Sequence, residues 1–435
     1  MPAAAEAIDP EREHEPAHRR LPGADPVTGR EVRGPAAVLE PAPPAALPHG
    51  RTAMSVLLGA LTSIGPLAID LYLPALPRLA ADLGVSASAA QLSLTAFMVG
   101  LGAGQVVVGP ISDAYGRRRP LLIGFAAFCA VSALCALAPS IHVLVALRLL
   151  QGLTAATGVA LTKAVVRDLY GGVEAARFFS MLMLVTGLVP LLGAELLRIT
   201  PWPGLFGVLA AAGGLLWLTA LLALPETHPP ALRGGTAPRA VLRPLVQVLG
   251  HRAFLVPTLT AALASGAMFG YVSSASFVLQ DVYELSPQGF SLLFGVNSAG
   301  MIAFGQLAGR LAGRVPMRRL LEAGLVLSGA AGALLLAAAL TGLGLPAVTA
   351  SLFLLTSGTG MVYPMALTIA MSSQPASRAG SASSVFGLAQ WTAGGLVGPV
   401  VGAFGTGTLT PLAVAVAVLT LAGCLSAAVF LRGRD

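Results

Sequence analysis

Long apolar runs, repeated from Met54 to Leu431, constrain this chain more than any other feature. A helix that rises 1.5 Å per residue needs about 20 apolar residues to cross a hydrocarbon core about 30 Å thick. Only 10% of the 435 residues are charged and 55% are hydrophobic, whereas roughly 25% are charged in a soluble domain. Most of the chain is therefore predicted to lie in a lipid bilayer.

Twelve such runs are present, and we predict a transmembrane helix for each. The first six cover residues 53–78, 90–111, 120–138, 142–166, 174–199 and 202–224. The second six cover residues 253–279, 288–312, 318–341, 346–371, 380–404 and 408–431. The predicted fold class is an all-α membrane protein, because glycine and proline inside such runs are usual where membrane helices pack closely and bend.

Composition outside the runs predicts how the chain divides. The first residues mix Pro, Ala, Glu and Arg without an apolar run, which predicts a disordered tail. A polar connector rich in Pro, Gly and Arg separates six runs from six, and the two sets start about 200 residues apart. Such a repeat predicts two six-helix bundles with a substrate path between them. The predicted units are a tail (1–51), a first bundle (52–224), a cytoplasmic linker (225–252), a second bundle (253–431) and a cytoplasmic C-terminus (432–435).

Basic residues in the loops predict the orientation. Six of the 26 Lys and Arg residues lie in the tail, and Arg148 and Lys163 lie inside runs. The other eighteen lie in loops or near the ends of runs, and sixteen of them share one side if the N-terminus is cytoplasmic. Only Arg78 and Arg198 then lie on the other side. Short basic loops resist translocation, so we predict that both termini are cytoplasmic. This topology accounts for the net charge of +7 without a nucleic-acid partner. The tail lacks a cleavable signal pattern, so the first span is expected to direct the chain to the plasma (inner) membrane as a multi-pass protein.

Several short motifs carry a resemblance to a known family. The loop after the second span reads GPISDAYGRRRP over residues 109–120, which resembles the GxxxDxxGRR signature of the major facilitator superfamily. The segments AIDLYLPALP (68–77), RLLQG (148–152), VRDLY (166–170), SFVLQDVY (276–283) and AGSAS (379–383) are similar to its drug/proton antiporters. The branch that these segments resemble is the bicyclomycin and chloramphenicol resistance (Bcr/CflA) branch, and the resemblance spans residues 52 to 431.

This resemblance implies a proton-coupled antiporter that exports drugs or other small amphipathic molecules by alternating access. The implied partners are the lipid bilayer, a small-molecule substrate and protons, and we expect a monomer. A proton gradient would drive transport, so neither a cofactor nor a metal is expected. The alternative is a transporter of the same fold that imports or exports a specific metabolite, because a fold does not fix a substrate.

Asp70 and Arg148 are the candidates for proton coupling and substrate binding. An acid inside an apolar span costs a few kcal/mol unless it is paired, protonated or in a water-filled cavity. Both residues lie roughly 9–12 Å below the outer surface at 1.5 Å per helical residue, so we expect them to share one cavity. Desolvation favours a protonated carboxyl group and a nearby guanidinium favours an ionised one, which allows a cycle of proton gain and loss. The alternative is a static ion pair that joins the first and fourth spans.

The 109–120 loop is predicted to be a cytoplasmic gate. In the family that it resembles, this loop holds the two bundles together through charge pairs and helix-end dipoles. We expect Asp113 to pair with an arginine and to break that pair in each cycle. The gating residues are Gly109, Asp113, Gly116, Arg117 and Arg118. Arg167 and Asp168 are secondary gate candidates, with a solvated loop pair as the equal alternative.

Two further sets of residues complete the predicted site. Aromatic and amide side chains suit amphipathic ligands, and each is as readily explained by helix packing. The cavity candidates are Tyr72, Gln151, Phe269, Tyr271, Asn297, Tyr363 and Gln390, and the helix-bend candidates in the fifth span are Gly187, Pro190 and Gly193. The sequence assigns no role to Lys163 or to Glu195.

Other functional classes lack their motifs. The phosphate-binding GxxxxGK[ST] loop of an ATP-driven pump is absent from the sequence. All six histidines lie in the tail, the loops or the span ends, which argues against an intramembrane hydrolase or metalloenzyme. A channel would not need the acid, the arginine and the loop in these positions. We therefore predict a transporter and not an enzyme.

Overall fold

The computed structural model describes residues 50–169, 193, 195–227, 245–375, 378–405 and 407–432. Within these ranges, eleven helices are long and apolar enough to cross a membrane. They match eleven of the twelve predicted spans to within a few residues at most ends. The remaining prediction, a span over 174–199, falls almost entirely outside the described residues. The tail and most of the linker also fall outside them, so those unit boundaries stay predictions.

The described chain is almost wholly helical, with one isolated β-bridge between Ala312 and Val315 and no strand in the ranges given above. The first group of long helices is α1 (Gly50–Asp70), α3 (Ala87–Tyr115), α4 (Arg118–Ala136), α5 (Ile141–Leu169) and α8 (Trp202–Ala223). The second is α10 (Arg252–Phe277), α11 (Pro287–Leu311), α12 (Met317–Thr341), α13 (Gly344–Ser372), α14 (Ala379–Ala403) and α15 (Thr410–Arg432). Short segments η1 (Leu73–Ala75) and α2 (Leu76–Asp82) follow α1, and η3 (Val278–Val282) follows α10.

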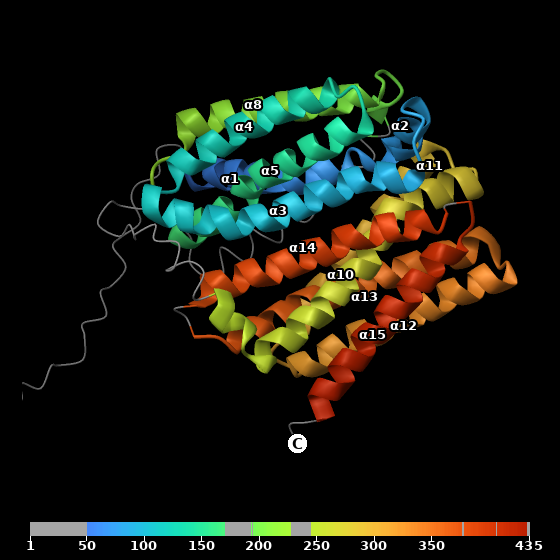
Figure 1. Cartoon of the computed structure of the whole chain (residues 1–435). Helices are drawn as coiled ribbons and strands as arrows, with labels where there is room; N and C mark the ends of the chain where they lie inside the picture. Colours follow the sequence, from blue (N-terminus) through green and yellow to red (C-terminus); the bar gives the residue numbers. More distant parts are fainter. Residues whose placement is uncertain are drawn as a thin grey trace, which may run out of the picture. The chain divides into compact units, whose positions relative to one another are not determined.

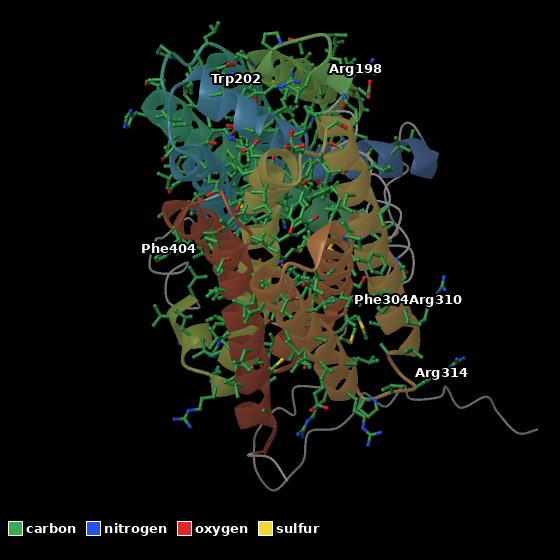
Figure 2. The ribbon with its side chains drawn as sticks, turned by 90° about the vertical axis from the view of Figure 1, so that its right-hand side faces the viewer. Arg198, Trp202, Phe304, Arg310, Arg314 and Phe404 are labelled. Atoms are coloured by element: carbon green, nitrogen blue, oxygen red, sulfur yellow. The ribbon has the colours of Figure 1, made fainter. Side chains whose placement is uncertain are left out.

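Each group packs mainly on itself, and the two meet along α3 and α14 (Figure 1). Within the first group α5 lies against α3, α4 and α1, and within the second α13 lies against α12, α11 and α10. Figure 2 shows a second view, with Arg198 and Trp202 in the first group and Arg310 and Arg314 in the second. The side chains of Arg310 and Arg314 are exposed and point away from the helices.

The same capping residue starts the second helix of each group. The Ser86 side chain accepts a hydrogen bond from the Ala89 amide at 3.2 Å, and the Ser286 side chain accepts one from the Gly289 amide at 3.1 Å. Both bonds satisfy an amide that the first helical turn leaves without an acceptor. This equivalence, 200 positions apart in the sequence, supports a repeat of two similar halves. We call the end of the molecule where α3 and α11 begin the serine-cap end.

The predicted first span is broken at its acid. Helix α1 ends at Asp70, and the chain continues through a turn, η1 and α2. Pro74 explains the break, because a proline ring clashes with the carbonyl group four residues earlier and cannot donate to it. Asp70 therefore lies at a discontinuity between two helical segments, a local structure that membrane transporters use for binding sites.

Candidate functional site

Arg148 is buried at 0% exposure in the core of the first group of helices. Its Nη1 atom donates a hydrogen bond of 2.6 Å to Gln151 Oε1, and Gln151 Nε2 donates one of 2.7 Å to Ser132 Oγ on α4. The predicted cavity residue Gln151 is thus the link between the arginine and a neighbouring helix. Its side chain is fully buried in this arrangement.

Three aromatic rings enclose the guanidinium group of Arg148. Its Cζ atom lies 4.3 Å from the ring centroid of Phe97, 5.0 Å from that of Tyr72 and 5.6 Å from that of Phe206. The negative faces of these rings stabilise a cation that has left water. Arg148 Nε and Nη2 remain buried without a hydrogen-bond partner. We call these three rings the aromatic cage.

No ion pair joins Asp70 to Arg148, although the structure describes both side chains. The alternative of a static pair between the first and fourth spans is therefore wrong for this conformation. Arg148 contacts the aromatic cage and Gln151 instead of the acid. The expected roles of the two residues in proton coupling stay predictions.

Tyr271 and Asn297 form a buried pair in the second group. Asn297 Nδ2 on α11 donates a hydrogen bond of 2.8 Å to the Tyr271 hydroxyl on α10. The Tyr271 ring also stacks on Phe294, with centroids 6.2 Å apart. Both members of the pair are at most 2% exposed, and Asn297 Oδ1 is buried without a partner. Two of the predicted cavity residues are thus brought together.

Three further cavity candidates lie in the second group of helices: Phe269, Tyr363 and Gln390. The Tyr363 hydroxyl lies beside Ser265 and Gln390 and donates to Met268 Sδ at 3.7 Å. Phe269 packs on Trp391 with centroids 5.4 Å apart, and Gly394 lies directly against the Phe269 ring. The remaining candidate, Tyr72, belongs to the aromatic cage, and its hydroxyl is 3.0 Å from Ser93 Oγ. The candidates therefore lie in separate clusters.

Polar side chains join the two groups at the serine-cap end. Ser88 Oγ donates to the Pro399 carbonyl at 2.9 Å, and Gln91 Nε2 donates to the Ser273 carbonyl at 3.2 Å. Thr95 donates to the Gly395 carbonyl in the same way. Ser276 Oγ on α10 donates to the Leu73 carbonyl at 2.8 Å. We call these four bonds the clasp.

Glycines on α14 allow the close approach that the clasp needs. A Cβ atom on Gly402 would overlap Gln91 Oε1 and lie 2.9 Å from Ser88 Cα, and one on Gly398 would overlap the Ser273 hydroxyl. A Cβ atom on Gly395 would lie 3.2 Å from Met98 Cβ. A larger residue at Gly395 or Gly402 would push α3 away, so these two glycines are required by contact between the groups. Gly398 is required by contact with α10 within the second group.

The predicted gating loop is tied to the end of α8. Glu226 accepts hydrogen bonds from the Arg117 amide at 2.8 Å and the Arg118 amide at 3.3 Å, and so caps the start of α4. Arg118 Nη2 also donates to the Leu221 carbonyl at 2.7 Å, and Arg117 Nη1 donates to Ser112 Oγ. Gly116 has φ +89°, a conformation that favours glycine. No described neighbour lies within 4 Å of a Cβ atom added to Gly109.

Several predicted residues lie outside the described part of the chain. Gly187 and Pro190 are wholly outside it. Asp113 is within α3, and Arg167 and Asp168 are within α5, but their side chains are not among those described. The expected pairing of Asp113 with an arginine therefore stays a prediction. Gly193 is described, and a Cβ atom there would overlap the Leu71 carbonyl, beside the break in the first span.

Sequence reasoning missed several of these residues. Phe97, Phe206 and Ser132 surround Arg148 or its partner from three other helices, and a single sequence does not show which helix faces meet. Glu226 follows an apolar run and precedes the basic linker, so it could have been proposed as a partner of the arginine loop. Gln91 is an amide within an apolar run, and this polarity was a usable signal for contact between helices.

These features define a class of protein. Long apolar helices form two packed groups that contain a buried cation and a half-buried acid at a helix break, and polar contacts join the groups. This is the architecture of a polytopic membrane transporter.

Comparisons identify the family. A model of the Major Facilitator Superfamily matches residues 58–399, so the chain belongs to this superfamily of transporters, which are not enzymes. The "Uncharacterized MFS-type transporter YdgK" of Bacillus subtilis is 40% identical over 382 residues, which cover 86% of this chain and 94% of that protein. A "Bicyclomycin resistance protein homolog" of Haemophilus influenzae is 26% identical, over 87% of this chain and 96% of its own. The human organic anion transporter MFSD10 has the same fold, with a TM-score of 0.65 at 19% identity over 86% of this chain and 98% of that one.

Proposed function

We propose that this transporter is a proton-coupled antiporter that exports small amphipathic molecules, including antibiotics. The observation that carries the proposal is Asp70, a carboxyl group at a helix break within a membrane span, for which no described residue provides a hydrogen bond or an opposite charge. Such an acid is stable when it binds a proton and can release that proton when its surroundings change. Similarity to a bicyclomycin resistance protein homolog supports an antibiotic as one substrate.

The clasp supports transport by alternating access. Its bonds join α3 to α10 and α14, and η1 to α10, so they hold the two groups together at the serine-cap end. A substrate that enters or leaves through this end requires the clasp to open. From the positive loops we propose that the serine-cap end is extracellular, that both termini are cytoplasmic and that the protein works as a monomer in the plasma membrane. We also propose that it needs no cofactor.

Counterflow in proteoliposomes tests this function. Purified protein is reconstituted, a pH gradient is imposed, and uptake of bicyclomycin and of the amphipathic dye ethidium is followed together with proton movement. Antiport predicts that drug and protons move in opposite directions and that a proton ionophore abolishes drug accumulation. A rate and extent of drug uptake that do not depend on the pH gradient would contradict proton coupling. Transport of a metabolite but of neither drug would favour the specific-metabolite alternative.

A further inference from the structure

A buried tyrosine of the second group lies at the depth of the acid of the first. Ser276 on α10 donates to the carbonyl of Leu73, which fixes α10 against the segment that follows Asp70. Helices α1 and α10 are the first spans of their groups, six spans apart, so they cross the membrane in the same direction. Asp70 is three residues before Leu73, about 6 Å at the 2.0 Å per residue of a 3₁₀-like turn. Tyr271 is five residues before Ser276, about 7.5 Å at the 1.5 Å per residue of an α-helix. The length of a tyrosine side chain spans this difference.

The Tyr271 hydroxyl has an unused hydrogen. Its oxygen accepts the bond from Asn297 Nδ2 at 2.8 Å, and no described residue accepts the proton of the hydroxyl. Stacking on Phe294 and burial at 1% exposure fix the ring. Among the described residues, Asp70 is the charged group whose field reaches this hydroxyl. An unused donor in one group of helices therefore lies at the depth of an acid that has no donor in the other.

Other ionisable side chains on the elements packed against α1, η1 and α10 are engaged elsewhere or lie at helix ends. Arg148 on α5 is held in the aromatic cage, and Tyr72 is bonded to Ser93. Arg78 on α2 donates to the Leu197 carbonyl, and the side chain of Lys163 on α5 is outside the described part. Helix α8 has no ionisable side chain. Tyr363 on α13 donates to Met268, and Cys424 on α15 donates to the Leu325 carbonyl. The groups at helix ends are Asp82, Asp113, Tyr115, His142, Arg167, Asp168, Arg252, Asp281, Arg310 and Arg432.

We propose that Tyr271, held by Asn297, is the positioning residue for Asp70. As the two groups of helices rearrange, its hydroxyl donates a hydrogen bond to the ionised carboxylate. The proton site is then divided between the two groups. When the hydroxyl reaches the carboxylate, the ionised form is favoured and the proton leaves. When it withdraws, the apolar surroundings favour the protonated form. The relative position of the two groups thereby sets whether Asp70 holds a proton, which deepens the antiport function proposed above and rests on it.

Infrared difference spectroscopy of the purified full-length protein tests this without a substrate. The carboxyl band that disappears in Asp70→Asn reports protonation of Asp70, and its midpoint is compared between wild type and Tyr271→Phe. Loss of one hydrogen bond to a charged group predicts that the midpoint rises by about one pH unit. Asn297→Ala, which frees the hydroxyl from its support, should shift the midpoint in the same direction by less.

Tyr363→Phe is the matched control, because Tyr363 is another tyrosine of the second group whose hydroxyl bonds to Met268. The midpoint of the Asp70 carboxyl band in Tyr363→Phe should equal that of wild type. An unchanged midpoint in Tyr271→Phe, with wild-type melting behaviour, would overturn the proposal for Tyr271 alone. If Tyr363→Phe shifts the midpoint of the Asp70 band as much as Tyr271→Phe does, the proposal is also overturned, because the shift would then be a general effect of substitutions in the second group. A wild-type protein in which Asp70 shows no titratable band would instead remove the proposed proton coupling.

Discussion

At the scale of single residues, the burial of Arg148 carries a large desolvation cost. A buried cation without a carboxylate partner loses its hydration, and three ring faces and one amide replace only part of it. A purely structural residue at this position would be better replaced by an apolar one, as buried charges elsewhere show. We therefore propose that this charge serves transport rather than folding.

Arg148→Met separates these roles. Methionine fills a similar volume without a charge to desolvate, so we expect the unfolding free energy to be unchanged or to rise by about 1–3 kcal/mol, while drug-coupled proton movement is lost. Thermal unfolding in detergent and the proteoliposome assay provide the two readouts. Arg198→Met, at an exposed arginine that pairs with Glu195, is the control and should alter neither. A strongly destabilised Arg148→Met protein would make the arginine a structural residue.

At the scale of helices, the packing of α14 on α3 explains how one arrangement of the two groups is held. The clasp uses small side chains and backbone carbonyls, so its bonds form only when the helices touch. Each such hydrogen bond makes a net contribution of about 0.5–1.5 kcal/mol to the stability of the clasped arrangement, which is small enough for a transporter to break in every cycle. Substitution of a contact glycine should then favour the other arrangement.

Gly402→Ala tests this directly. Its methyl group would overlap Gln91 and approach the backbone of Ser88, so we expect the serine-cap end to open and the population of the clasped state to fall. Spin labels at Asp82→Cys and Phe404→Cys, both exposed at this end, report the distance between the groups. Gly380→Ala, in the same helix with no described atom within 4 Å, should leave the distance distribution unchanged. Identical distributions for both variants would show that the glycine contact does not control the arrangement.

At the scale of the whole molecule, the architecture could be predicted from the sequence much further than the site. Apolar runs are long and their ends are marked by charges, so eleven predicted spans agree with described helices. The same pattern hid the break at Asp70, because 53–78 is apolar on both sides of the acid and only the position of Pro74 relative to the acid indicated the break. The number of residues from the outer end of each span predicted one depth for Asp70 and Arg148, but it could not show which way each side chain faces. The aromatic cage of Arg148 depends on the rotations of α3, α5 and α8 and on the turn that holds Tyr72, which no single span encodes.

One measurement tests the central claim that Asp70 couples proton movement to export. Wild-type and Asp70→Asn proteins are reconstituted, and proton release on addition of bicyclomycin or ethidium is recorded with and without a pH gradient. Asparagine keeps the shape of the side chain but cannot titrate, so we predict that the variant inserts and melts like wild type, yet loses drug-driven proton movement and drug accumulation against a gradient. Drug-driven proton movement at the wild-type rate in Asp70→Asn would contradict the account.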